Sequence, residues 1–221
     1  MARVAPVAFS EQRGRWVFRG HSDSSFRLIP SIARSTHTSR SVLAFEKSIL
    51  TAFRREASIY TPARLESEWE WLAFAQHHGL PTRMLDFTHN PLVALYFAVC
   101  ELPDSEAELF ALQSKRRVAE STLEKPPFDL SQPQKYYPKI VSPRIRAQEG
   151  LFVVFADPTA ALDDSLPGGW SLKRYVIPAG AKKLIRYQLF RLGVHCSSLF
   201  PDVEGLSARL KWQHAVSPEL I

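Results

Sequence analysis

The segment from Gln76 to Asn90 is rich in polar side chains, although apolar stretches flank it on both sides. It contains a glutamine, three histidines, two threonines, an arginine, an aspartate and an asparagine. An unsatisfied polar group next to a core costs about 1–3 kcal/mol, so these side chains must either bond one another or face a ligand. Because functional polar groups concentrate on loops that rigid elements hold in place, the segment predicts a functional cleft.

Each of these residues also has a structural interpretation. Arg83 and Asp86 can form an internal ion pair that fixes a turn, and Gln76 can bond a neighbouring carbonyl. Thr82 can stabilise the turn, and Asn90 can cap the helix that follows. The density of the cluster, rather than any single residue, favours a site.

Several blocks of the sequence, in this order, resemble the FRG domain family, which is named after a Phe-Arg-Gly motif. They are WVFRG at 16–20 with LIPS at 28–31 and Arg34, QHHGLPTRMLDFT at 76–88 followed by Asn90-Pro91, PRIRAQEGLF at 143–152, and LFPDVEG at 199–205. Met84, Phe87 and Val203 depart from the usual family residues, but none of these departures removes a polar group. The resemblance implies an FRG-like domain over 14–215, after an N-terminal extension at 1–13.

FRG domains occur widely in bacteria and phages, sometimes beside defence or toxin genes, without a settled activity. The resemblance therefore implies a bacterial or phage protein and leaves its chemistry open. A toxin or phage-defence effector that acts in the cytoplasm is the expected setting.

The leading hypothesis for the chemistry is an NAD-using, ADP-ribosyltransferase-like enzyme. An arginine ends an early strand, a threonine precedes a helix, and a Gln-Glu pair precedes a late strand, which is similar to the R…S/T…E pattern of arginine-type ADP-ribosyltransferases. In this interpretation Arg19 holds a phosphate or the nicotinamide-side ribose, and Thr88 braces the nicotinamide. Gln148 or Glu149 binds the ribose hydroxyl and stabilises an oxocarbenium-like centre.

The general base toward the acceptor would be His77 or Asp86. The candidate catalytic residues are thus Arg19, His77, Asp86, Thr88, Gln148 and Glu149. The candidate ligand-binding residues are Gly20, Arg34, Gln76, Thr82, Arg83, Asn90 and Arg144. The acceptor is either a nucleic acid or a protein.

Two alternatives from other functional classes remain open. One is a non-catalytic module that binds a nucleotide or nucleic acid in an arginine-rich pocket formed by Arg19, Arg34, Arg83, Arg144 and Arg146. The other is a nuclease or other hydrolase that uses His77, Asp86 and His89. No H-E-x-x-H or C-x-x-C spacing is present, so no metal is expected.

The elements that position these residues can be read from periodicity and caps. Apolar residues at helical spacing predict a helix over 42–60, with Glu46 outside its apolar face. Ser67 and Glu70 form a capping box for a second helix that ends near Gly79, and Asn90-Pro91 starts an apolar central helix over 91–100. A last helix is capped by Asp202 and runs to about Trp212.

Strands are predicted at 16–18, 108–112, 151–155 and 172–177, another helix at 181–192, and an irregular loop or insertion at 115–137. Helices in the N-terminal half and a mostly later sheet indicate a single α+β domain, with an ADP-ribosyltransferase-like fold in the leading hypothesis.

The bulk composition is that of a globular domain. The chain has 221 residues, 45% hydrophobic and 23% charged, with a net charge of +6 and two isolated cysteines. The positive charge permits an acidic partner such as a nucleotide or nucleic acid, and two cysteines do not make a disulfide framework. No apolar run reaches membrane-spanning length. The oligomeric state is not indicated.

Overall fold

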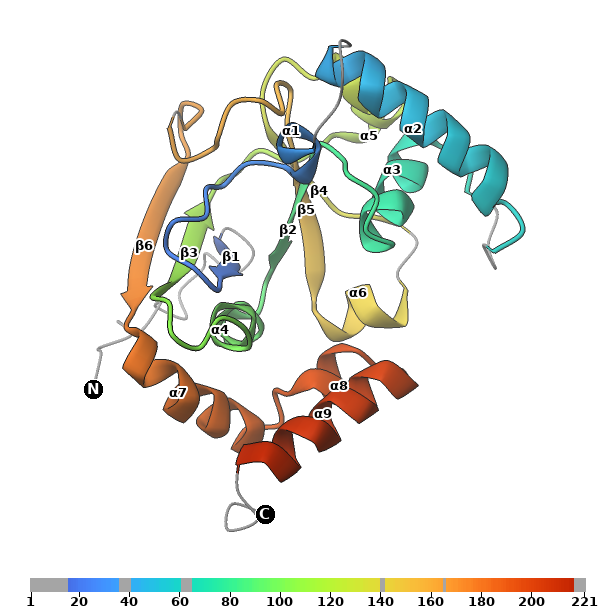
Figure 1. Ribbon diagram of the computed structural model, residues 1–221. Coiled ribbons are helices and arrows are strands. Elements are labelled where there is room, and N and C mark those ends of the chain that lie inside the picture. The colour runs from blue at the N-terminus through green and yellow to red at the C-terminus, as the bar shows by residue number, and fades with distance from the viewer. Residues whose placement is uncertain (1–15, 36–40, 61–64, 140–141, 165, 217–221) are drawn as a thin grey trace.

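The computed structural model describes residues 16–35, 41–60, 65–139, 142–164 and 166–216. The expected N-terminal extension, 1–13, lies outside these residues. Within them, six strands form one sheet in the spatial order β4-β5-β2-β1-β3-β6, and each pair of neighbours is antiparallel. The strands are β1 (Trp16–His21), β2 (Met84–Thr88), β3 (Ala107–Gln113), β4 (Gln134–Tyr136), β5 (Gly150–Val154) and β6 (Ser171–Ile177) (Figure 1).

The helices confirm the α+β class. They are α1 (Ser31–Arg34), α2 (Val42–Ala57), α3 (Glu68–His77), α4 (Pro91–Val99), α5 (Glu120–Leu123), α6 (Pro143–Ala147), α7 (Ala179–Arg191), α8 (Cys196–Leu199) and α9 (Val203–Val216). The expected separation into early helices and later strands is only partial, because β1 precedes every described helix and α7–α9 follow the last strand. Among the described residues, no helix has the length and apolar character needed to cross a membrane.

Helix ends follow the local signals in the sequence. The Ser67–Glu70 capping box is present with both of its hydrogen bonds, and the Asn90 side chain accepts from Leu92 N with Pro91 in the first turn. Gly79 has a φ of +83° directly after α3, the conformation that favours glycine. Asp202 accepts a hydrogen bond from Gly205 N at 2.7 Å, as expected of a cap.

The stretch 115–137 is more regular than the predicted loop. It contains α5, a 3₁₀ turn at Pro127–Asp129 and the edge strand β4, which pairs with β5. Residue Tyr136 of β4 is buried and packs near Trp69, so this stretch helps to close the core. Its polar, proline-rich composition concealed a three-residue strand, which is too short to show periodicity.

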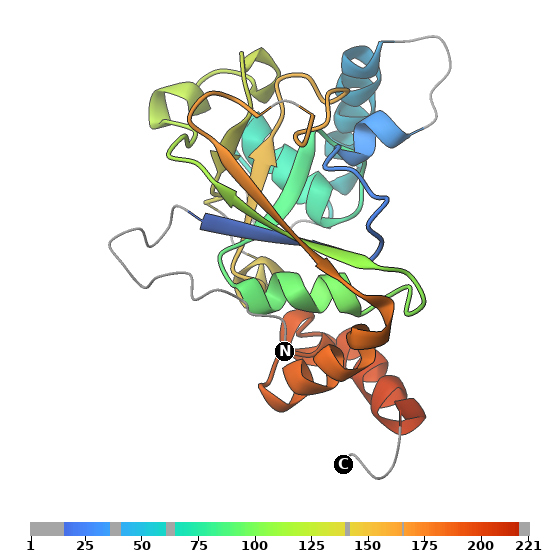
Figure 2. The same ribbon diagram turned by 90° about the vertical axis from the view of Figure 1, so that its left-hand side faces the viewer.

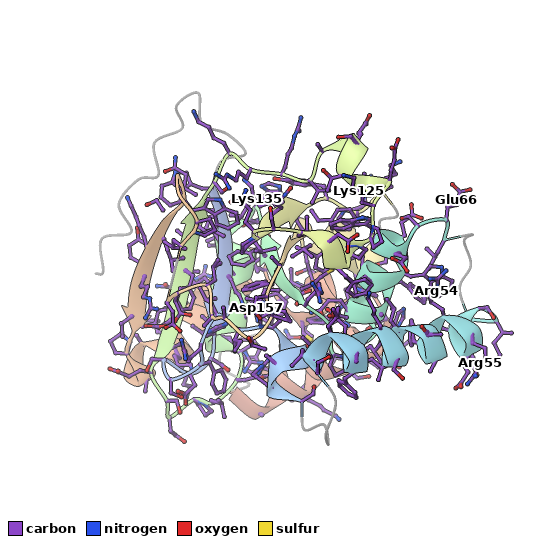
Figure 3. The ribbon with its side chains drawn as sticks, turned by 90° about the horizontal axis from the view of Figure 1, so that it is seen from above. Arg54, Arg55, Glu66, Lys125, Lys135 and Asp157 are labelled. Carbon is purple, nitrogen blue, oxygen red and sulfur yellow. The ribbon has the colours of Figure 1, made fainter. Side chains whose placement is uncertain are left out.

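Charged residues within the core hold distant segments together. Glu46 of α2 is fully buried, contrary to its predicted position outside the apolar face, because it receives two hydrogen bonds from Arg83, from N at 2.7 Å and from Nε at 2.8 Å. By contrast, Arg54 and Arg55 lie on the exposed end of the same helix (Figure 3). The pair fixes α2 against the start of β2.

The last three helices lie under α4, which separates them from the sheet (Figure 2). Lys182 of α7 is almost fully buried, and its ammonium donates to three loop carbonyls, those of Ser22 at 2.9 Å, Leu102 at 2.6 Å and Ser105 at 3.2 Å. Lys182 therefore ties α7 to the loops that follow β1 and α4.

Gly20 sets the closest approach between β1 and α4. A Cβ at this position would lie 2.0 Å from Ala94 O and 2.6 Å from Ala98 N, both backbone atoms of the helix. Because backbone cannot move aside as a flexible side chain can, only glycine permits this packing. The glycine of the Phe-Arg-Gly motif thus has a packing role here.

We expect Gly20→Ala to lower the free energy of unfolding by about 3 kcal/mol, since overpacking a core against backbone forces the helix away from the sheet. Urea unfolding measured by circular dichroism checks this. Gly168→Ala is the matched control, because its Cβ would meet nothing within 4 Å, and it should change stability by less than about 0.5 kcal/mol. Equal losses in the two variants would contradict the packing role.

Candidate functional site

A cavity of about 700 Å³ opens where β1 and β2 diverge. The two strands pair at Phe18 and Thr88, and beyond this point their residues line opposite walls. Further lining residues come from the end of α3, from α4, from α6 and from β5. The volume lies within the range of about 300–1,000 Å³ that is usual for small-molecule sites.

Arg19 is fixed on one wall by two hydrogen bonds. Its Nε donates to His21 Nε2 at 2.9 Å, and Nη1 donates to Asp86 O at 2.7 Å. The Asp86 carboxylate lies 3.9 Å from Nη1. In the part of the chain that the structure describes, Nη2 donates to no acceptor, so one face of a rigid guanidinium remains available.

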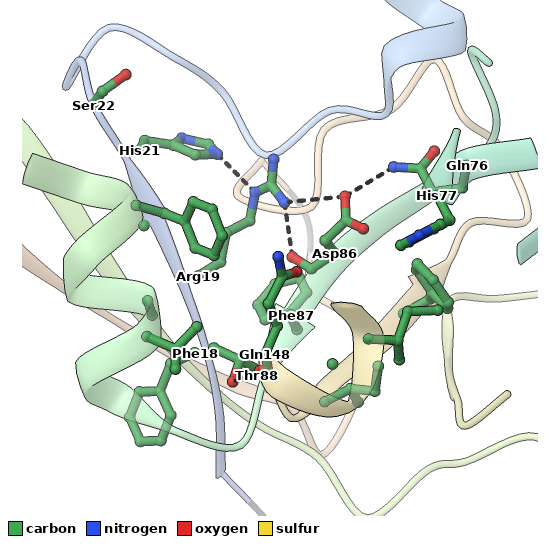
Figure 4. Close-up of a pocket in the computed structure, with 18 of the residues that line it drawn as sticks. Phe18, Arg19, His21, Ser22, Gln76, His77, Asp86, Phe87, Thr88 and Gln148 are labelled. Carbon is green, nitrogen blue, oxygen red and sulfur yellow. Dashed lines mark hydrogen bonds and ion pairs between the residues drawn. The ribbon is translucent and has the colours of Figure 1, made fainter. Parts of the chain in front are cut away.

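Asp86 stands between the two walls and is held from the other side (Figure 4). Gln76 Nε2 donates to Asp86 Oδ2 at 2.8 Å, and Thr82 Oγ1 donates to Gln76 Oε1 at 2.6 Å. Thr82 is fully buried, and its Oγ1 also accepts a hydrogen bond from Met84 N, so its position is fixed by the core. A buried threonine thereby orients a glutamine, which orients a carboxylate whose side chain is 60% exposed.

His21 is the partner that the sequence analysis missed. Its Nε2 accepts from Arg19, which assigns the ring proton to Nδ1, and Nδ1 lies 3.1 Å from Phe26 O, which accepts it. Burial, and then the neighbouring Arg19, lower the pKa of His21 to about 3. Its position two residues after Arg19 on the same strand was the available signal, since alternate strand residues share a face.

His77 and Arg144 line the opposite wall. His77 Nε2 lies 3.3 Å from Ser142 Oγ, and burial, followed by the charge of Arg144, lowers the pKa of His77 to about 4. The Arg144 guanidinium lies over the ring of Phe200, 4.3 Å from its centroid. His77 is therefore neutral at pH 7 and can accept a hydrogen bond.

Thr88 and Gln148 form the floor of the cavity. The Thr88 hydroxyl donates to Gln148 O at 2.7 Å and accepts from Asn90 N at 3.0 Å. Gln148 Nε2 donates to Leu199 O at 3.1 Å, which leaves its side-chain oxygen without a bond among the described residues. The hydroxyl thus shapes the floor, while the amide oxygen of Gln148 can meet a ligand.

The structure brings most of the candidate residues to this one cavity. Its lining includes Arg19, Gly20, Arg34, Gln76, His77, Asp86, Thr88, Arg144 and Gln148.

Four candidates lie elsewhere, each for a physical reason. Arg83 is 1% exposed and pairs with Glu46 rather than with Asp86, and Thr82 is buried beneath Gln76. Asn90 caps α4 and donates to the carboxylate of Glu149 at 2.9 Å. Glu149 has a φ of +47°, and this left-handed turn directs its exposed side chain away from the cavity that Gln148 lines.

Of the three residues of the hydrolase alternative, His77 and Asp86 line the cavity but His89 does not. His89 does not line the cavity and instead stacks on Tyr137, with ring centroids 5.7 Å apart. Within the described ranges, no group of three or more metal-binding side chains is placed to hold a metal ion.

The neutral state of His21 makes a pH prediction. The unfolded chain protonates this ring below about pH 6.5, whereas the folded chain does so only near pH 3. The stability that the neutral ring contributes is therefore complete above about pH 6.5 and is lost as the pH falls. We expect His21→Gln to reduce the slope of unfolding free energy against pH by about 1 kcal/mol per pH unit between pH 6 and 5.

Urea titrations at several pH values measure this slope. His214→Gln, at an exposed position of α9, is the control and should leave the slope unchanged. An unchanged slope in His21→Gln would show that the ring is protonated in the folded protein at these pH values.

Comparisons with known proteins agree with the sequence motifs. Searches among curated proteins and solved structures gave no match to this chain. The family model of the FRG domain matches residues 14–107, which include Arg19, Gln76, Asp86 and Thr88, while the blocks at 143–152 and 199–205 lie beyond the matched range. Residues 14–107 are therefore identified as an FRG domain.

Proposed function

We propose that the cavity binds NAD and that the chain acts as an ADP-ribosyltransferase-like enzyme. The observation that carries the proposal is the convergence of Arg19, Thr88 and Gln148, far apart in sequence, on one cavity at the divergence of β1 and β2. Arg19 offers its open guanidinium face to a phosphate, which is the group that a fixed arginine fork binds best.

The lining suits a nucleotide as a whole. Phe18, Phe26 and Phe97 supply apolar ring surface for a base or nicotinamide, and Arg34 adds a second cation near Arg19. A cavity with apolar walls and a few convergent polar groups is the usual form of a cofactor or substrate site.

The reaction would proceed at the ribose carbon that carries nicotinamide. The C1′–N bond breaks, and its electron pair goes to the ring nitrogen, which releases neutral nicotinamide. An acceptor hydroxyl then forms the new C1′–O bond and gives its proton to solvent or to a base. Asp86, beside Arg19, is a cavity carboxylate that would stabilise the positive charge at C1′, a role that Glu149 does not fill because it does not line the cavity.

A second candidate is a module that binds a nucleotide without transferring ADP-ribose. It is favoured by Gln148, because a neutral amide in the floor binds a ribose hydroxyl but cannot balance an oxocarbenium charge. The exposure of Asp86 points the same way, since solvent weakens its electrostatic effect. NAD turnover separates the two candidates.

We expect Arg19→Ala to weaken NAD binding by roughly 10- to 100-fold, because a charge-assisted hydrogen bond contributes about 1.5–3 kcal/mol. Isothermal titration calorimetry measures the dissociation constant. Arg191→Ala, an exposed arginine at the end of α7, is the control. If both variants bind NAD as the unaltered protein does, Arg19 does not hold the ligand.

Asp86→Asn tests the chemistry separately from binding. We expect it to retain NAD affinity within about three-fold but to lower the rate of nicotinamide release by roughly 100-fold or more, as loss of a transition-state interaction does. Nicotinamide is quantified by chromatography. Tight NAD binding by the unaltered protein without any nicotinamide release would support the binding module instead.

A further inference from the structure

The wall opposite Arg19 carries a second group of basic side chains. Arg144 of α6, His77 at the end of α3 and His78 directly after it all line the cavity. We call these three residues the Arg144 cluster. The rings of His77 and His78 are 5.0 Å apart and perpendicular, so the group is compact.

The Arg144 cluster forms no ion pair with the described residues. Arg144 makes no ion pair with any carboxylate in the described part of the chain, whereas Arg27, Arg83 and Arg174 are among the arginines that contact an aspartate or glutamate. Arg144 is nevertheless held in place, because its guanidinium lies over the ring of Phe200. A fixed guanidinium with free donors is suited to a phosphate.

The electrostatic setting agrees with a missing anion. Burial first, and then Arg144, lower the pKa of both His77 and His78. Asp86 raises the pKa of His77, but by less than burial and Arg144 lower it. An anion placed against the Arg144 cluster would balance the charge of Arg144 and raise the pKa of both imidazoles.

NAD does not account for this second group. Its anionic charge is concentrated in one pyrophosphate, which Arg19 and Arg34 would hold on the other side of Asp86. The Arg144 cluster is therefore left for a different ligand that meets the nucleotide at Asp86. In a transferase, that ligand is the acceptor.

We propose that the Arg144 cluster is the phosphate subsite of the acceptor, and that the acceptor is a nucleic-acid strand. The inference rests on the proposed function in so far as it calls this ligand an acceptor. The phosphate subsite itself is inferred from the contacts of the Arg144 cluster. The net charge of +6 favours a polyanion over a protein surface. A concave site favours the end of a strand, which can enter where a continuous duplex cannot.

The test is direct binding of a short single strand, labelled at its 3′ end and phosphorylated at its 5′ end, without NAD. Fluorescence anisotropy is expected to show that Arg144→Ala weakens binding at least ten-fold. Arg146→Ala is the matched control, because Arg146 belongs to the same helix but is exposed and does not line the cavity. It should change binding less than two-fold.

Removal of the 5′ phosphate should weaken binding to the unaltered protein by a similar factor, and Arg144→Ala should then have no further effect. The comparison of the two strands on the unaltered protein needs no variant, so it holds even if Arg144→Ala fails to fold. Equal binding of the two strands, equal effects of the two arginine variants, or tighter Arg144-dependent binding of a phosphoserine peptide would each overturn the proposal.

NAD binding, measured on the same samples, keeps the two proposals separate. Arg144→Ala should retain the NAD affinity of the unaltered protein, since Arg19 lies on the other wall. If the protein binds the phosphorylated strand through Arg144 but does not bind NAD, the proposed enzyme fails and the phosphate subsite stands.

Discussion

The site depends on the separation of β1 and β2 next to Phe18 and Thr88. Adjacent antiparallel strands normally satisfy each other's backbone groups along their length. Here the pairing of β1 with β2 stops, and the side chain of Arg19 supplies a donor instead. Arg19 Nη1 donates to Asp86 O across the gap. The hydrogen bond that satisfies the carbonyl of Asp86 therefore also fixes Arg19 in the cavity. Gly20, the next residue, allows α4 to form the adjacent wall.

Cations of two kinds are present in this fold, and their partners distinguish them. Lys182 and Arg83 are buried and have several acceptors each, so they hold loops and strands together. Arg19, Arg34 and Arg144 line the cavity. Toward the described residues, Arg19 uses Nε and Nη1 but not Nη2, and the guanidinium groups of Arg34 and Arg144 donate no hydrogen bond. Donors without an acceptor in a concave site can bind a ligand, whereas the donors of a structural ion pair are already used.

Local signals predicted most helices and most strands, because a cap or an apolar period is complete within a few residues. Ser67, Asn90 and Gly79 each act on their own turn, and the structure has them as predicted. The partner of Arg83 was predicted wrongly, since Glu46 is distant in sequence and its fully buried carboxylate cannot be recognised from helical spacing alone. Strand β2 was also missed, because its alternating Asp86 and Thr88 suggested a polar loop.

The cavity itself was predicted in outline from the density of polar residues and the family motifs. What could not be read from the sequence was the direction of each side chain. Gln148 and Glu149 are neighbours, yet the left-handed backbone at Glu149 separates their side chains, and nothing in a Gln-Glu-Gly sequence requires a non-glycine residue there to adopt positive φ. The contact between His21 and Arg19 likewise could not be predicted before the structure gave the position of the Arg19 guanidinium.

The spatial order of the sheet has a consequence for how this domain can be divided. The matched range, 14–107, contains β1 and β2 and stops at the first residue of β3. In the folded sheet these central strands lie between β5 and β3, whose residues come almost entirely from the later part of the chain. A fragment cut at the boundary of the match would expose two bare strand edges and half a cavity, so we expect the motif-bearing segment to need the later segment in order to fold.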